Sequence, residues 1–209
     1  MNMNSKTDTV DKKKLFTTQK MVLIALFGAI SAILMVLEFP LPLFPPFLKM
    51  DFSELPVIIG GYIMGPFAGL VIILIKVGLN FVFNGTTTGG VGELSNMLCS
   101  VCYMIPAVLI YQRKKNKTNA AISLAVGTIV VSIFSIFNNL YLIFPIYSKV
   151  MGLDMNAIVG MCSKVNPAIK DTFTLIAIGI VPFNLIKYAV ASLITFLVYK
   201  RVKKVLFKI

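Results

Sequence analysis

Long apolar runs separated by short polar breaks fill this chain from Met21 onward. Hydrophobic residues make up 57% of its 209 residues and charged residues only 13%, a balance unlike that of an ordinary soluble domain. A helix needs about 20 mostly apolar residues to cross roughly 30 Å of hydrocarbon. The lengths of the runs therefore predict an all-α membrane protein with no large soluble domain.

Six runs are candidate transmembrane helices. They cover approximately residues 19–38, 54–65, 67–84, 92–111, 120–145 and 174–199. The second is short, contains glycines and is followed by Pro66, which favours a shortened or tilted helix joined to the next by a tight turn. We expect a six-helix transmembrane domain over residues 19–200, with cytoplasmic tails at 1–18 and 201–209. The first run approaches full membrane length, so it is expected to remain as a span and not to be removed as a signal peptide.

The basic residues support six spans. The net charge of +12 gathers at the ends of the apolar runs, which favours a membrane protein over a nucleic-acid binder. With six spans and a cytoplasmic N-terminus, 14 lysines and arginines in the N-terminal tail, the 112–119 linker and the C-terminal tail all face the cytoplasm. A five-span arrangement would place the C-terminal basic cluster outside, against the positive-inside rule.

The sequence lacks the residues that several kinds of catalytic chemistry require. No GxxxxGK[ST] phosphate loop and no GxGxxG motif occur, so ATP hydrolysis would require another subunit. Histidine is absent, and the CxxC of Cys99 and Cys102 lies within an apolar run, which disfavours a metal site. As an acid–base pair only Glu93 with Lys187 qualifies, so we do not expect an enzyme.

Two lysines, Lys76 and Lys187, lie inside apolar runs. A charge at membrane depth costs about 2.5–3.5 kcal/mol on insertion scales and usually indicates a ligand site or a pathway. Lys76 shares a helical face with Asn80 and Asn84, and Lys187 shares one with Asn184. Lys76 could instead snorkel towards an interface.

Asparagines add further polar groups within the runs. Asn138 and Asn139 interrupt the fifth run, so four predicted helices contribute polar side chains. Interhelical hydrogen bonding, at about 0.6–2 kcal/mol for each asparagine, is the alternative to ligand binding. Together these groups predict a polar cavity between the helices.

Two connecting segments flank this cavity. Residues 39–56 contain five prolines, which exclude a continuous helix, and Asp51 and Ser53 at the end of this segment are expected to cap the next helix. Residues 84–97 are rich in glycine and threonine, which predicts a re-entrant loop on the outer side of the membrane. Glu93 and Asn96 follow three residues apart and can face the same cavity.

The segments FPPFLKMDFSELP, NGTTTGGVGELSNM and FNLIK resemble the riboflavin-binding S components of energy-coupling factor (ECF) transporters, the RibU family, over about Met21 to Lys200. The resemblance implies a six-helix bundle, a pocket near the extracellular side and a location in the bacterial cell membrane. It also implies riboflavin as the transported ligand, with no resident cofactor, and partnership with a membrane coupling subunit and two cytoplasmic ATPases. Another flavin such as FMN, another vitamin, or a small channel remain alternatives.

The resemblance also implies roles for individual residues. Asn184 and Lys187 match the polar pair that binds the flavin ring, and Asn138 or Asn139 supplies a further ring contact. Ala25 and Ala29 match the small residues that contact the coupling subunit. The implied rim of the site comprises Thr87, Gly90, Glu93 and Asn96, and the implied lid comprises Phe44, Phe47, Lys49 and Asp51.

One departure concerns the third run. The family often has an acid three residues before its lysine and an asparagine one residue after it, where this chain has Ile73 and Val77. Lys76 and Asn80 are nevertheless expected to face the pocket, with Lys76 lacking its usual local partner.

Overall fold

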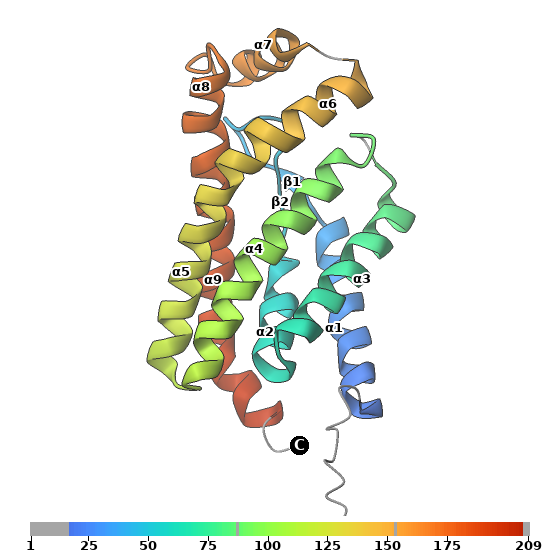
Figure 1. Cartoon of the computed structure of the whole chain (residues 1–209), viewed down its shortest axis with the longest axis vertical. Coiled ribbons are helices and arrows are strands. Elements are labelled where there is room, and N and C mark those ends of the chain that lie inside the picture. Colours follow the sequence, from blue (N-terminus) through green and yellow to red (C-terminus); the bar gives the residue numbers. More distant parts are fainter. Residues whose placement is uncertain (1–16, 87, 153, 207–209) are drawn as a thin grey trace, which may run out of the picture.

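The computed structural model describes residues 17–86, 88–152 and 154–206, with side chains described up to Tyr199. It is a bundle of helices with a small two-stranded ribbon at one end (Figure 1). The first half of the chain contributes α1 (Thr18–Val36), β1 (Phe39–Pro40), β2 (Lys49–Met50), α2 (Glu54–Met64), α3 (Pro66–Asn84) and α4 (Val91–Arg113). The second half contributes α5 (Lys117–Phe137), η1 (Asn138–Ile143), α6 (Phe144–Met151), α7 (Met155–Val165), α8 (Thr172–Thr174), η2 (Leu175–Ile180) and α9 (Val181–Leu206).

The apolar runs form helices close to the predicted boundaries. Five continuous helical segments are long and apolar enough to cross a membrane: Thr18–Val36, Pro66–Asn84, Val91–Arg113, Lys117–Met151 and Thr172–Tyr199. The remaining run forms α2, which has only 11 residues and is too short to cross a bilayer without tilting or thinning it. Over the residues that the structure describes, five helices thus have spanning length, where the sequence predicted six spans.

Three features of the half of the molecule that contains the ribbon were not predicted. The proline-rich segment is not helical, as expected, but it contains the antiparallel ribbon that pairs Phe39 with Met50 and Pro40 with Lys49. The helix α7 lies between the fifth and last runs and crosses the end of the bundle (Figure 1). The π-helical segments η1 and η2 interrupt the two longest helices on this side of the molecule.

Small residues allow the helices to approach closely. A Cβ added to Gly127 of α5 would lie 2.9 Å from the carbonyl oxygen of Tyr103 in α4, so this crossing requires glycine. A Cβ on Gly28 of α1 would lie 2.6 Å from Ile75 of α3. Close approach of this kind favours helix association in lipid, where no hydrophobic effect drives it.

The bundle has two hydrophobic cores. The larger unites α2, α3, α4, α5 and α9, and α2 is central to it, contacting α1, α3, α4 and α9. A smaller core of α6, α7, η2 and neighbouring residues closes the opposite end. The start of α1, the α4–α5 connection and the end of α9 share the lower end in Figure 1, whereas α7 lies at the upper end and the ribbon lies below it in the upper half. A polar region separates the two cores.

Candidate functional site

A cavity of about 350 Å³ lies between the two cores, beneath the ribbon. It is bounded by α3, α4, η1, α6, α7 and α9, together with the segment around β1 and β2. Its polar lining residues are Glu38, Lys49, Asn80, Asn84, Thr88, Glu93, Ser95, Asn96, Asn139, Asn184 and Lys187. Its aromatic lining residues are Phe47, Phe144, Tyr147, Phe183 and Tyr188. The cavity therefore combines flat apolar walls with several hydrogen-bonding groups.

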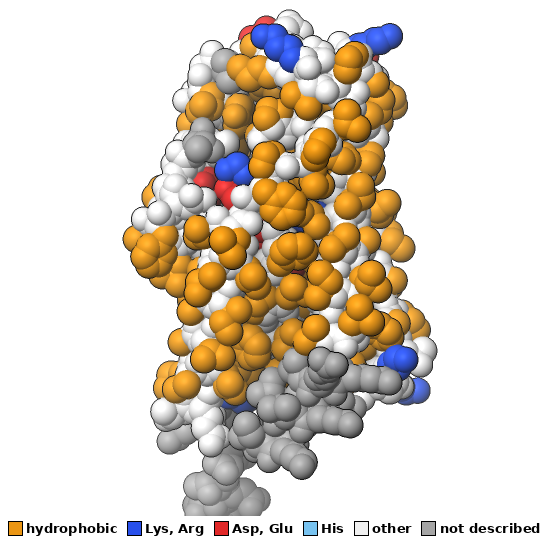
Figure 2. Space-filling model, turned by 180° about the vertical axis from the view of Figure 1, so that it is seen from behind, with side chains coloured by type: hydrophobic (Ala, Val, Ile, Leu, Met, Phe, Trp, Pro, Cys, Tyr) orange, Lys and Arg blue, Asp and Glu red, His pale blue; other side chains and the backbone are white. Residues whose placement is uncertain are grey.

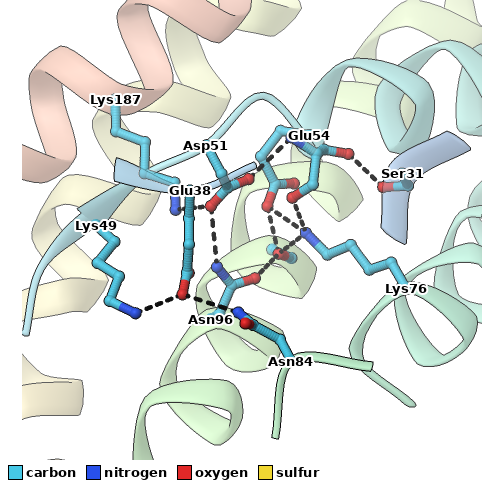
Figure 3. A network of polar contacts seen from close by, with 11 residues as sticks. Ser31, Glu38, Lys49, Asp51, Glu54, Lys76, Asn84, Asn96 and Lys187 are labelled. Atoms are coloured by element: carbon cyan, nitrogen blue, oxygen red, sulfur yellow. Dashed lines mark hydrogen bonds and ion pairs between the residues drawn. The ribbon is translucent and has the colours of Figure 1, made fainter. Parts of the chain in front are cut away.

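Lys187 is held in this cavity by the segment that follows the ribbon. Its Nζ lies 2.7 Å from Asp51 Oδ2, and both side chains are buried. Asp51 Oδ1 also accepts a hydrogen bond of 2.8 Å from the Ser53 amide, while Asn96 Nδ2 lies 3.5 Å from Oδ2 (Figure 3). Asp51 thus fixes the position of the Lys187 ammonium group. It also joins the ribbon segment, which comprises residues 39–51, to α9.

The Asp51 carboxylate remains ionised despite its burial. Desolvation acts to raise its pKa, but the charges of Lys187 and Lys76, with hydrogen bonds from Lys187 and Ser53, outweigh that effect. The pKa of Asp51 is accordingly lowered to about 2. At neutral pH the side chain is an anion that balances one lysine charge.

Two asparagines present acceptor oxygens to the cavity. Asn184 Nδ2 donates to the Ile180 carbonyl at 2.9 Å, and Asn139 Nδ2 donates to the Ser135 carbonyl at 2.8 Å. Each amide group is therefore tied to its own helix one turn earlier, which leaves its Oδ1 available to a ligand donor. Asn80 Oδ1 is buried and has no hydrogen-bond partner among the described residues.

The rim of the cavity carries ionised side chains from three segments. Lys49 Nζ lies 2.6 Å from Glu38 Oε1, and Asn84 Nδ2 donates to the same oxygen at 3.3 Å. Glu93 Oε2 accepts hydrogen bonds from Thr86 Oγ1 at 3.1 Å and from Thr88 Oγ1 at 3.4 Å. These groups are partly exposed, in contrast to Lys187.

The loop before α4 is a compact connection, not the predicted re-entrant segment. Thr86 Oγ1 accepts from the amides of Gly90 and Thr88, at 2.7 and 3.2 Å, and Thr88 Oγ1 accepts from Gly92 at 2.9 Å. Gly89 and Gly90 have positive φ angles of 61° and 87°, which glycine adopts at little cost. The loop therefore serves to begin α4 and to orient Glu93.

Lys76 lies outside the cavity lining. It is fully buried, and its Nζ contacts Glu54 Oε1 at 2.6 Å, Ser53 Oγ at 2.9 Å and Ser100 Oγ at 2.8 Å (Figure 3). Its partner is thus Glu54 of α2 in place of an acid on its own helix. These contacts also exclude snorkelling. Ser53 uses its hydroxyl for Lys76 and does not cap α2, contrary to the sequence-based expectation.

The two buried ion pairs are connected. Asn96 Nδ2 lies 3.5 Å from Asp51, and Asn96 Oδ1 lies 3.3 Å from the Ser100 hydroxyl, which also contacts Glu54. A polar network therefore runs from Lys187 in the cavity to Lys76 beneath it. Sequence spacing along one helix could not reveal this network, because Lys76 and Glu54 are 22 residues apart.

Some of the predicted site residues line the cavity and others do not. The cavity lining includes Lys187, Asn184, Asn139, Asn96, Glu93, Asn80, Phe47 and Lys49 from the predicted set. Asn138 lies outside it and donates to Ser95 at 3.0 Å, and Phe44 packs edge-on against Phe183 at 5.6 Å. Gly90 precedes α4 without lining the cavity, and Thr87 lies outside the described residues.

Several lining residues were missed. Glu38 ends the first apolar run, and Ser95 precedes Asn96, so both carried a weak polar signal. Ile158 and Met161 belong to α7, and no sequence signal separated them from ordinary apolar surface residues. Cys99 also lines the cavity, and the described residues contain no group of three or more histidine, cysteine or acidic side chains that could hold a metal ion.

The predicted partner-contact residues lie on the outer face of α1. Ala25 and Ala29 are exposed, whereas Gly28 and Ala32 face the bundle interior. The small residues of α1 thus lie on two different faces of the helix. Ala25 and Ala29 are available to another membrane subunit.

Comparisons with known proteins agree with this architecture. The family model described as "ECF transporter, substrate-specific component" matches residues 19–199. The riboflavin transporter RibU of Staphylococcus aureus (strain TCH60) is 31% identical over 209 residues, covering all of both chains. The riboflavin transporter FmnP of Bacillus subtilis (strain 168) is 30% identical over 188 residues, which is 88% of this chain and 92% of that protein.

A solved structure has the same fold. It is described as "Structure and mechanism of the S component of a bacterial ECF transporter" and aligns with a TM-score of 0.72 and 29% sequence identity. The alignment covers 90% of this chain and 98% of that chain. Sequence and structure therefore point to the same group of proteins.

Proposed function

The chain belongs to the substrate-specific components of ECF transporters, and we propose on this premise that it captures riboflavin in the cavity beneath the ribbon. It is a multi-pass protein of the bacterial membrane. The named riboflavin transporters that it resembles over nearly their full lengths support the choice of ligand. The observation that carries the proposal is the pairing of a fixed ammonium group with free amide oxygens between aromatic walls.

The cavity has the chemistry that riboflavin requires. Its flavin ring is flat and carries carbonyl acceptors beside an imide N–H donor, and its ribityl chain carries hydroxyl groups. The Lys187 ammonium group can donate to a ring carbonyl, while the Oδ1 of Asn184 or of Asn139 can accept from the single imide N–H. The volume of about 350 Å³ lies within the range of about 300–1,000 Å³ that is usual for small-molecule sites.

The ribbon segment is proposed to act as a lid. It contacts the rest of the site through the Asp51–Lys187 pair, through Phe44 on Phe183, and through Asn166 Nδ2, which donates to the Leu43 carbonyl at 3.2 Å. Opening of the lid would have to break these contacts together. Ligand binding would favour the closed arrangement only by the difference in its affinity for the two states.

Transport requires further subunits. We propose that a membrane coupling subunit docks against Ala25 and Ala29, and that two cytoplasmic ATPases drive release of the ligand inside. Six spans, with α2 as a short one, would place both chain ends in the cytoplasm. The start of α1, the α4–α5 connection and the end of α9 lie at the same end of the molecule in Figure 1. The three basic clusters of the sequence adjoin these points along the chain, which supports this orientation.

The test is a titration of purified protein in detergent. We expect a bound yellow flavin, or saturable quenching of added riboflavin fluorescence. Replacing Asn184 by alanine or Lys187 by methionine should weaken binding by about 1–3 kcal/mol, because buried partners on the ligand are left unsatisfied. Asn156→Ala on the exposed side of α7 is the matched control. A folded sample with no flavin affinity would refute the proposal and favour a channel-like role.

A further inference from the structure

We propose that this cavity selects uncharged riboflavin over its phosphorylated form, and that Glu93 is the residue that sets this preference. The inference rests on the proposed function and concerns the specificity of the same site. It follows from an inventory of the charged groups around the cavity and of the backbone amides that could hold an anion.

Both cations of the cavity are already neutralised. Lys187 Nζ lies 2.7 Å from the Asp51 carboxylate, and Lys49 Nζ lies 2.6 Å from the Glu38 carboxylate. The first pair is buried, and the second is partly exposed at the rim. A phosphate group approaching either lysine would therefore also approach a carboxylate at hydrogen-bonding distance from that lysine.

Glu93 has no such counterion. Within the described part of the chain its carboxylate contacts only the hydroxyl groups of Thr86 and Thr88. These neutral donors stabilise the carboxylate and leave its charge uncompensated. When Asp51, the partner of Lys187, is counted with the charged lining residues, both ion pairs balance and Glu93 leaves one net negative charge.

The first amides of α4 are also already paired within the chain. A helix N-terminus often binds phosphate through its free amides. Here the amides of Gly90 and Gly92 donate to Thr86 Oγ1 and Thr88 Oγ1, and the amide of Val91 donates to the Thr88 carbonyl at 3.3 Å. Glu93 in the first turn already uses the favourable field of the helix.

The consequence for a ligand depends on its charge. A phosphate monoester carries about −1.5 to −2 at pH 7, whereas the ribityl hydroxyls of riboflavin are neutral. A phosphate keeps most of its hydration if it remains near the open rim, where Glu38, Lys49 and Glu93 are partly exposed. Figure 2 shows a group of acidic and basic side chains that interrupts a mostly hydrophobic face of the molecule. A dianion placed at the rim therefore meets an uncompensated carboxylate.

The experiment compares dissociation constants for riboflavin and riboflavin 5′-phosphate, measured by fluorescence quenching at low and high salt. The readout is the dissociation constant for riboflavin 5′-phosphate divided by that for riboflavin. A substitution that weakens the binding of both flavins equally leaves this ratio unchanged. We expect the wild-type protein to bind riboflavin more tightly. Glu93→Gln should reduce the ratio about five- to tenfold, the effect of removing one charge near a phosphate dianion in a hydrated rim.

A second variant and a control separate charge from shape. Glu38→Gln releases the Lys49 ammonium group and should also reduce the ratio, while Asp154→Asn at the exposed start of α7 should not change it. Added salt should reduce the wild-type ratio more than that of Glu93→Gln, because screening weakens the same repulsion.

The outcomes distinguish the two proposals. A protein that binds neither flavin refutes the riboflavin function itself. A protein that binds riboflavin but has a ratio near one, or whose ratio is unchanged by Glu93→Gln, refutes the charge selection alone. A reduced ratio in both rim variants, with the Asp154→Asn ratio unchanged, supports it.

Discussion

Replacing Lys76 by methionine tests whether this lysine stabilises the fold or binds the ligand. The side chain is fully buried and makes three contacts shorter than 3 Å, to Glu54, Ser53 and Ser100. Methionine fills a similar volume but leaves the Glu54 carboxylate buried without a counterion. Breaking a buried ion pair in this way costs about 3–5 kcal/mol.

The expected effect is large enough to measure. In a chain of this length each kcal/mol shifts the unfolding temperature by about 2–4 °C, so Lys76→Met should lower it by roughly 6–20 °C. Thermal unfolding in detergent, followed by circular dichroism or by the fluorescence of an added dye, provides the assay. Lys164→Met on the exposed side of α7 is the matched control and should change the free energy of unfolding by no more than about 0.5 kcal/mol.

A second substitution completes the argument. In Lys76→Met/Glu54→Gln no buried charge is left without a partner at this site, so the double variant should recover most of the lost stability and unfold above Lys76→Met alone. The reasoning is refuted if the single variant unfolds within about 2 °C of wild type while losing flavin affinity. That pattern would return Lys76 to the ligand site.

The remaining predictions concern pH, packing and assembly. Because folding lowers the pKa of Asp51 from 3.8 to about 2, its stabilising contribution is complete above about pH 4 and is lost as the pH falls towards 2; Asp51→Asn should remove this acid dependence from thermal unfolding curves. Gly127→Ala places a methyl group against a neighbouring backbone carbonyl and should cost about 1–3 kcal/mol of unfolding free energy, whereas Gly78→Ala, with open space around its Cβ, should be neutral or stabilising. Replacing Ala25 or Ala29 by tryptophan should prevent co-purification with a coupling subunit while riboflavin binding by the isolated chain persists; intact assembly in both variants would contradict the proposed docking face.

The sequence predicted the long helices well because the bilayer imposes their length and polarity. The helices observed at Thr18–Val36 and Pro66–Asn84 differ from the predicted runs at 19–38 and 67–84 by no more than two residues at either end. The ribbon and α7 were missed because they lie outside these long runs. There, tertiary contacts such as the hydrogen bond from Asn166 to the Leu43 carbonyl join distant segments without any local periodicity.

The polar site was predicted less completely, and Lys76 and Asn80 show why. Helical spacing places both on one face of α3, and both are indeed buried. They lie one turn apart, however, and only Asn80 lines the cavity, while Lys76 meets Glu54. Spacing gives the direction of a side chain on its own helix, but depth and partners depend on the packing of other helices. The motif around Asn184 and Lys187 was more informative because both residues reach the same cavity.

The two π-helical segments divide each of the longest helices into parts with separate rotational settings. A π segment accommodates a single additional residue, and one residue corresponds to about 100° of turn in an α-helix. Because the wide turn absorbs this rotation, deleting one residue from Asn138–Ile143 would restore a regular α-helical turn and leave Phe144 and Tyr147 facing the cavity. Relatives can therefore gain or lose one residue at this point while both halves of the molecule keep their contacts.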